Sequence, residues 1–274
     1  MNKAILTKEN YATNHDYLSY STLSKFLRCE AAANARFKTA PTPSLLVGSY
    51  VDAYFSNEMD LFKTEHPEIF NSKTGELKAD FKKADEIIKR IESDEELMYY
   101  LSGEKQVIMT GEIDGVDFKI KMDSYKEDEF ICDLKIMKDF NRVWSESFQR
   151  YTSFVQAYDY DIELAIFQEI VRQNTGKQLP CIIATVTKEE PSDVGLFQIP
   201  QSELDIALKV VKNNLPRIKK ILDKKTAPYR CEKCAYCRLT KKARLMDSEY
   251  IGLSGDKLRE NGFECVDPII KEEN

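Results

Sequence analysis

The sequence predicts an α/β protein in which helices flank a mixed central β-sheet. Two observations carry this prediction. Apolar residues follow helical spacing up to about residue 101, alternate with polar residues from residue 106, and later return to helical spacing. An Asp-Gly pair separates two of the alternating runs, which is a strong hairpin signal. No linker-like stretch interrupts this order, so we expect a single domain over residues 1–274.

The first part of the domain, residues 19–101, is predicted to be helical. An amphipathic helix covers residues 21–37, with Ser21 as its N-cap. A second helix follows a Pro-Thr-Pro break and covers residues 44–55, and a third, highly charged helix covers residues 79–101. Pro67 and residues 71–75, which lie between the second and third helices, mark a loop.

The middle part, residues 104–199, should form the sheet core. Two strands, 106–113 and 116–122, flank the Asp-Gly turn, and a third strand, 129–136, follows a polar turn. A long helix is predicted over residues 147–172.

Further apolar runs complete the predicted sheet and its cover. Residues 179–187 read as a buried strand and residues 195–199 as a short edge strand. The last part, residues 200–246, contains a basic helix over 201–225 and a cysteine-rich loop, and a short helical tail follows. The whole order indicates helical layers on both sides of a mixed sheet.

The charge of the chain is unevenly distributed. The formal net charge is −6 and the isoelectric point about 5.3, which taken alone argues against a nucleic-acid partner. The segment 209–244, however, contains thirteen lysines and arginines and only two acidic residues. A locally basic face can hold a phosphate backbone, although a solvated helix face is the simpler interpretation of any single lysine. No apolar run approaches a membrane span of ~20 residues and no apolar leader is visible, so we expect a cytoplasmic protein without a membrane partner.

Two aspartates and a lysine form the candidate catalytic site. Asp123 ends the second predicted strand, and Asp133 and Lys135 lie in the third. Because residues i and i+2 of a strand point to the same face, Asp133 and Lys135 should share a face. Antiparallel pairing through the intervening turn would bring Asp123 close to Asp133. The alternative is an exposed polar strand face, but the apolar neighbours of Asp133 and Lys135 favour a buried setting, where unpaired charges are costly.

This arrangement suits metal-dependent phosphodiester hydrolysis. Two adjacent carboxylates repel each other unless a cation lies between them, and carboxylate oxygens suit Mg²⁺ or Mn²⁺. Such a metal polarises a phosphate, helps generate hydroxide and stabilises the leaving oxygen. Lys135 would hold or deprotonate the attacking water, or stabilise charge at the phosphate. Only two histidines occur, His15 and His66. A Ser/His or Cys/His hydrolase needs a catalytic histidine, so this class of mechanism is disfavoured.

Over about residues 19–242 the chain resembles the PD-(D/E)xK nucleases, and among them the RecE-like exonucleases of phages and prophages (exonuclease VIII type). The order and spacing of several motifs make the resemblance specific. These motifs are Ser-Tyr-Ser-Thr-Leu-Ser-Lys-Phe, Leu-Val-Gly-Ser-Tyr-Val-Asp, Gly-Glu-Ile-Asp-Gly-Val-Asp-Phe-Lys-Ile-Lys-Met-Asp, Cys-Asp-Leu-Lys, Tyr-Asp-Tyr-Asp-Ile-Glu-Leu-Ala-Ile-Phe-Gln-Glu and Arg-Cys-Glu-Lys-Cys-Ala-Tyr-Cys-Arg. The resemblance implies a restriction-endonuclease-like α/β core.

The resemblance also implies roles for individual residues. Asp123 and Asp133 would bind the metal, with the Leu134 carbonyl completing the inner shell. Lys135 would be the catalytic lysine. Relatives carry a Gly-x-x-x-His pattern on an early helix, and the histidine position is Asp52 here. Asp52 is therefore a candidate ligand of a second metal, and a solvent-facing helix residue is the equally weighted alternative.

One family pattern is altered in this chain. Relatives carry Gln-x-x-x-Tyr on the helix after the lysine strand, and by register those positions are Glu163 and Phe167. Glu163 is therefore the candidate for positioning DNA. Because both residues differ from the family pattern, the DNA-positioning role of this helix is in doubt. Gln156 and Tyr160 fit the same spacing one segment earlier, in a poorer sequence context. Core packing is the favoured interpretation of Phe167 and Tyr160.

Four cysteines form a candidate metal site. Cys231, Cys234 and Cys237 make a Cys-x2-Cys-x2-Cys motif, and three close thiols in a cytosolic chain suggest metal. Zn²⁺ or an iron–sulfur cluster needs a fourth ligand, for which Cys29 is the candidate. The chain is similar here to AddB-like and CRISPR-adaptation nucleases, whose one early and three late cysteines hold a structural [4Fe–4S] cluster, although the late spacing differs. The alternative is a knuckle of reduced thiols.

Together these features predict a Mg²⁺-dependent exodeoxyribonuclease. It would digest double-stranded DNA from its ends, with an expected 5′-3′ polarity, and leave single-stranded tails for phage-type recombination. The resemblance implies a RecT-type single-strand annealing protein as a partner, and the need for a closed DNA passage suggests a ring-like homo-oligomer. Two alternatives stay open: a catalytically weakened DNA-binding protein on a nuclease fold, and a PD-(D/E)xK endonuclease.

Overall fold

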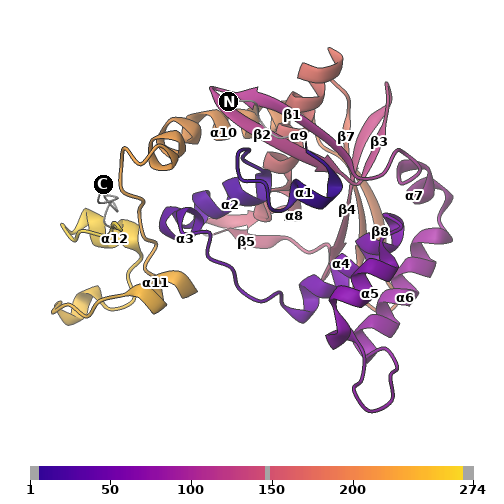
Figure 1. The fold of residues 1–274 in the computed structure, drawn as a ribbon, viewed down its shortest axis with the longest axis horizontal. Coiled ribbons are helices and arrows are strands. Elements are labelled where there is room, and N and C mark those ends of the chain that lie inside the picture. Colours follow the sequence, from indigo (N-terminus) through magenta and orange to yellow (C-terminus); the bar gives the residue numbers. More distant parts are fainter. Residues whose placement is uncertain (1–5, 146–148, 268–274) are drawn as a thin grey trace.

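A four-stranded mixed sheet lies at the centre of the computed structural model, which describes residues 6–145 and 149–267 (Figure 1). The strands lie in the order β3, β4, β7, β8. β3 and β4 are antiparallel, β4 and β7 are parallel, and β7 and β8 are antiparallel, which confirms the predicted mixed sheet. Their bounds are β3 Ser124–Lys126, β4 Phe130–Met137, β7 Cys181–Thr187 and β8 Val194–Gln198.

The predicted hairpin forms a separate two-stranded ribbon from β1 (Val107–Ile113) and β2 (Val116–Met122). Its turn residues Asp114 and Gly115 have φ values of 47° and 75°, the left-handed conformation that a tight hairpin turn requires. After β2 the chain bends at Asp123 and forms β3, a short strand that the sequence did not predict. Asp123 therefore lies at the junction between the ribbon and the central sheet.

Helices cover both faces of the sheet. Ile131 of β4 packs in a core with α9 and α10, whereas Leu134 packs on the opposite face with α4 and α6. Because side chains alternate along a strand, Asp133 and Lys135 point to the same side as Ile131, toward α9. The bounds of these helices are α4 Pro43–Phe55, α6 Ala79–Glu92, α9 Tyr160–Thr175 and α10 Gln201–Leu222.

The predicted helix over residues 21–37 is wrong as a single element. It is divided into α2 (Tyr20–Arg28) and α3 (Glu30–Asn34), because Cys29 adopts an extended conformation. The N-cap is Ser19 rather than Ser21, since the Ser19 side chain accepts a hydrogen bond from the backbone N–H of Thr22. The helix predicted over 79–101 is likewise divided, by a new N-cap at Asp94.

The long helix predicted over residues 147–172 begins later than expected. Residues 143–145 and 150–152 form a small antiparallel hairpin, β5–β6, and two predicted helix residues, 147 and 148, lie outside the described residues. Two helices follow, the single turn α8 (Phe154–Ala157) and then α9.

The C-terminal segment contains short helices beside α3 (Figure 1). Within the described ranges, no helix is both long and apolar enough to cross a membrane. The remaining elements are α1 Lys8–Tyr11, α5 Met59–Glu65, α7 Glu95–Tyr100, β5 Val143–Ser145, β6 Arg150–Thr152, α11 Ala235–Thr240, α12 Gly255–Glu260 and two 3₁₀ turns, Pro67–Ile69 and Ser248–Tyr250.

Candidate active site and cysteine cluster

The two predicted catalytic aspartates lie side by side. β3 pairs with β4 so that Ser124 is opposite Cys132, and this register brings the preceding residue, Asp123, opposite Asp133. The contact is fixed by a hydrogen bond of 3.0 Å from the backbone N–H of Leu134 to Oδ2 of Asp123. The unexpected strand β3 is thus what holds the first aspartate against the strand that carries the second.

Lys135 connects the aspartates to α9. Its Nζ lies 2.6 Å from Oδ2 of Asp133 and 2.9 Å from Oε2 of Glu163. The same Nζ lies 5.0 Å from the centre of the Tyr160 ring. The structure therefore brings the altered family position, Glu163, directly to the lysine, and Tyr160 joins it.

The structure places the candidate residues for the Gln-x-x-x-Tyr pattern in different environments. Phe167 is buried in the core between the helices and the sheet, as its core-packing interpretation requires. Tyr160 faces Lys135, so its interpretation as a core residue is incomplete. Gln156 lies on α8, in the turn that is capped by Ser153.

Burial and like charge make this an unusual acidic site. Burial, followed by the charge of Asp123, raises the pKa of Asp52 to about 7. Asp52 is half-buried on α4, and its role as a ligand of a second metal stays a prediction. Burial also raises the pKa of Asp133, with Lys135 opposing the shift and the charge of Glu163 adding to it.

Lys135 has the opposite balance. Burial disfavours its charge, but the carboxylates of Asp133 and Glu163 outweigh that effect and raise its pKa well above the usual range. The ammonium group is therefore charged at neutral pH. In this arrangement Lys135 can donate hydrogen bonds, and it is poorly suited to remove a proton from water.

Sequence reasoning missed Gln106 as part of the site. Gln106 is buried with a φ of 56°, and its Nε2 lies 2.8 Å from Oγ of Ser56 and 3.5 Å from Oδ1 of Asp123. Ser56 in turn hydrogen-bonds to Oδ1 of Asp52 at 3.3 Å. No local motif marks Gln106, since it looked like an ordinary polar residue at the start of a strand.

The donor types present suit a divalent cation, because Asp52, Asp123 and Asp133 carry the carboxylate oxygens that Mg²⁺ and Mn²⁺ prefer. Among the described residues, however, only Cys29, Cys231, Cys234 and Cys237 bring three or more candidate ligand atoms within 4.8 Å of one another. In addition, Oε1 of Gln106 is buried and accepts no hydrogen bond from the described residues. This buried oxygen lacks a partner beside the carboxylates, and a cation or a water could supply one.

The four candidate cysteines meet although about 200 residues separate the first from the others. Their Sγ atoms all lie within 4.8 Å of one another. Sγ of Cys237 lies 3.6 Å from that of Cys29 and 3.9 Å from that of Cys231. All seven cysteines are free, so the proximity is not due to disulfides.

The break between α2 and α3 makes this cluster possible. Cys29 stands at the break, and the next residue, Glu30, accepts two hydrogen bonds from Arg217 at 2.6 and 2.8 Å. Glu30 also accepts a bond from the backbone N–H of Tyr229, whose carbonyl accepts one from Ala31. These contacts fasten the start of α3 to the chain segment that carries the other three cysteines.

Comparisons with known proteins agree with this architecture. A sequence family described as "PDDEXK-like domain of unknown function (DUF3799)" matches residues 19–240. The crystal structure of a "putative exonuclease" from Eubacterium rectale is 42% identical, covers 92% of this chain and 100% of its own, and has a TM-score of 0.86. A second solved structure, SSO0001, is 12% identical, covers 82% of this chain and 98% of its own, and with a TM-score of 0.30 carries no argument. No curated protein matches the chain.

Proposed function

Because the chain belongs to the PDDEXK-like family DUF3799, we propose that it is a metal-dependent nuclease, and more specifically a Mg²⁺-dependent exodeoxyribonuclease. It would digest double-stranded DNA from the ends, in the 5′-3′ direction, and leave single-stranded tails. The observation that carries this proposal is the buried contact of Asp133 with Lys135, beside Asp123 and Glu163. The description of the Eubacterium rectale protein as an exonuclease supports digestion from ends.

Asp123 and Asp133 would hold the metal, together with the Leu134 carbonyl, and Asp52 would bind a second ion. A divalent cation bound there supplies a Lewis acid for the phosphate and lowers the pKa of the attacking water. Mg²⁺ is the first candidate and Mn²⁺ the second, because both prefer oxygen ligands.

The protein's own side chains would orient the reacting groups. Protonated Lys135 donates hydrogen bonds to a phosphate oxygen or to the attacking water, and so stabilises negative charge as it develops. Glu163 keeps Lys135 charged and fixes its direction through the 2.9 Å contact. Glu163 is therefore a positioning residue, and this role takes the place of the DNA-positioning role of the family's glutamine.

Two further proposals concern partners and cofactors. A RecT-type annealing protein would receive the single-stranded tails, and a ring-like homo-oligomer would enclose the DNA during digestion. The four-cysteine cluster would hold a structural metal, because four thiols gathered around one point match the donor set of Zn²⁺ or an iron–sulfur cluster.

The test is digestion of linear and closed-circular duplex DNA, each with Mg²⁺ or with EDTA. We expect Mg²⁺-dependent loss of the linear form alone, with the circle intact. Cutting of the circle would replace the exonuclease by an endonuclease on the same fold. Absence of cutting in both forms would contradict the nuclease and favour a DNA-binding protein with lost chemistry. Linear DNA labelled at either the 5′ or the 3′ ends gives the polarity in the same assay.

A further inference from the structure

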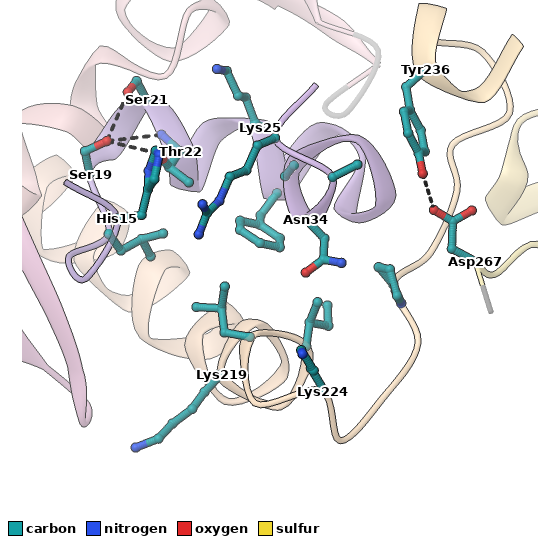
Figure 2. Close-up of a pocket in the computed structure, with 18 of the residues that line it drawn as sticks. His15, Ser19, Ser21, Thr22, Lys25, Asn34, Lys219, Lys224, Tyr236 and Asp267 are labelled. Carbon is teal, nitrogen blue, oxygen red and sulfur yellow. Dashed lines mark hydrogen bonds between the residues drawn. The ribbon is translucent and has the colours of Figure 1, made fainter. Parts of the chain in front are cut away.

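A large groove lies between the N-terminal helices and the C-terminal segment. It has a volume of about 1430 Å³ and is bounded by α2 and α3, by the end of α10, and by the segment that carries the cysteines. Figure 2 shows Lys25 of α2 on one side, Lys219 and Lys224 on a second, and Tyr236 with Asp267 on a third. Three separate parts of the chain therefore border one space.

The groove is basic although the whole chain is acidic. Eleven lysines and arginines line it against six aspartates and glutamates, whereas the chain as a whole has a net charge of −6. Its cations come from three parts of the sequence, namely residues 25–38, 119–121 and 219–244. Such a concentration of positive charge in a concave surface attracts a polyanion.

Several of these cations are available to a ligand. Arg36, Lys38 and Lys242 are exposed, and none of them makes an ion pair within the described parts of the chain. Burial, followed by the charges of Arg36, Lys119 and Lys38, lowers the pKa of the nearby His15, as expected in a field of positive charge. By contrast, Lys119 already has partners within the protein, since its Nζ donates hydrogen bonds to the backbone carbonyls of Tyr11 and Asn14.

The groove reaches β2, the strand that ends just before Asp123, at Lys119 and Lys121. Both line the groove, and Lys121 stands two residues before Asp123 on β2. Nζ of Lys121 lies 5.8 Å from the centre of the Tyr11 ring. Burial, followed by the charge of Glu163, raises the pKa of Tyr11 above its ordinary range.

We propose that this groove binds a single-stranded nucleic-acid segment that is continuous with the strand in the active site. The inference rests on the proposed nuclease function. Cations along a groove together with aromatic rings are the combination with which proteins hold single strands without sequence preference, and His15 is the exposed ring in this groove. The phosphates would contact Arg36 and Lys38 on one wall and Lys242 on the other.

Binding is tested with a fluorescently labelled oligothymidylate in EDTA, followed by anisotropy over a range of salt concentrations. The groove variant is Lys38→Glu with Lys242→Glu. The control variant is Lys209→Glu with Lys220→Glu, which changes the charge equally at exposed lysines of α10 outside the groove. We expect the groove variant to bind at least about tenfold more weakly than the control. Each lost phosphate contact should also reduce the slope of log K against log salt by about 0.7, hence by about 1.4 for two contacts.

Three results would overturn the inference. One is a parent protein that does not bind the oligothymidylate at all. Another is an equal loss of affinity in both variants, which would reflect net charge alone. The third is a groove variant that loses affinity for a duplex of the same length but retains it for the single strand. Because the titration contains EDTA, it reads binding independently of cutting, so failure of the nuclease proposal is scored separately in the Mg²⁺ assay.

Discussion

At the scale of single residues, Glu163 is the informative position, because its Oε2 lies 2.9 Å from Nζ of the catalytic lysine candidate, Lys135. Glu163→Gln removes one of the charges that hold Lys135 protonated. Hydrogen bonds to charged groups contribute about 1.5–3 kcal/mol, so we expect cutting to fall about ten- to hundredfold. Steady-state digestion of linear duplex by the purified variant measures this loss.

Glu169→Gln is the matched control for this prediction. Glu169 lies on the same helix and pairs with Arg172 and Gln173, away from Lys135. A positioning role also predicts that the pH profile of cutting changes in Glu163→Gln, which a purely structural role would not do. Equal activity of the two variants would contradict the role of Glu163.

Asp52 carries a prediction about pH. Burial and the charge of Asp123 raise its pKa to about 7, from an ordinary value of 3.8. A carboxyl with a raised folded-state pKa stabilises the protein at low pH, and this contribution is lost as pH rises through the folded value. In EDTA, the melting temperature of the parent relative to Asp52→Asn should therefore fall between about pH 4 and pH 7.

A divalent cation should reverse this trend. Mg²⁺ binds the ionised carboxylates, so the rise in melting temperature on adding Mg²⁺ should be larger above about pH 7 than below it. The measurement is thermal unfolding of both proteins with Mg²⁺ or EDTA across this range. A parent and an Asp52→Asn variant with the same pH dependence would contradict the buried, charge-coupled position of Asp52.

Strand periodicity was sufficient to predict part of the site. Asp133 and Lys135 share a face because they are two apart in a strand, and the turn before them brings Asp123 across. Gln106 could not be found in this way, since its part in the site depends on contacts with Ser56 and Asp123, distant in sequence. The charge that surrounds Lys135 is likewise a property of tertiary contacts.

At the scale of elements, the start of α2 gives a direct comparison of two serines. Ser19 caps the helix, whereas Ser21, the cap expected from the sequence, is exposed within the first turn. Ser19→Ala should lower the free energy of unfolding by about 1 kcal/mol. Ser21→Ala should change it by less than about 0.5 kcal/mol. Urea unfolding of both variants measures these free energies. A larger loss of unfolding free energy in Ser21→Ala than in Ser19→Ala would be inconsistent with the observed cap.

The cysteine cluster leads to a prediction about metal content. Thiolates about 2.3 Å from one tetrahedral ion lie about 3.8 Å apart, close to the separations of 3.6 and 3.9 Å between these sulfurs. We therefore expect one zinc ion per chain by elemental analysis. Cys237→Ser should lose the metal and melt at a lower temperature, whereas Cys265→Ser, at a buried thiol outside the cluster, should retain it.

Two other results of the metal analysis are possible for the cysteine cluster. Iron with the visible absorption of a cluster would keep the metal site and contradict the single-ion arrangement. A protein that contains neither metal would leave the cysteines as a knuckle of reduced thiols.

Helix breaks were the elements that the sequence predicted least well. Helical spacing continues through Cys29, and the break depends on Glu30, which is bound by Arg217 and Tyr229 from distant parts of the chain. The mixed sheet was predicted because turn signals and alternation are local. The short strand β3 was not, because its three residues are too few to show a period.

At the scale of the whole molecule, the distribution of charge was predicted only in part. Six of the thirteen basic residues in the segment 209–244 line the groove, and the other cations of the groove come from α2, from the segment that follows α3 and from β2. The remaining basic residues of the segment lie elsewhere, since an amphipathic helix such as α10 spreads its polar side chains over several outward directions. The basic surface is thus assembled by the fold.

The most direct test of the account is digestion of a linear duplex by site variants. Asp133→Asn and Lys135→Ala should each lower Mg²⁺-dependent cutting at least about a hundredfold, because they remove the metal ligand and the charge that stabilises the phosphate. Lys138→Ala is the control, since Lys138 follows the same strand with 91% of its side chain exposed. Full activity in either site variant, or an equal loss in the control, would contradict the assignment of the active site.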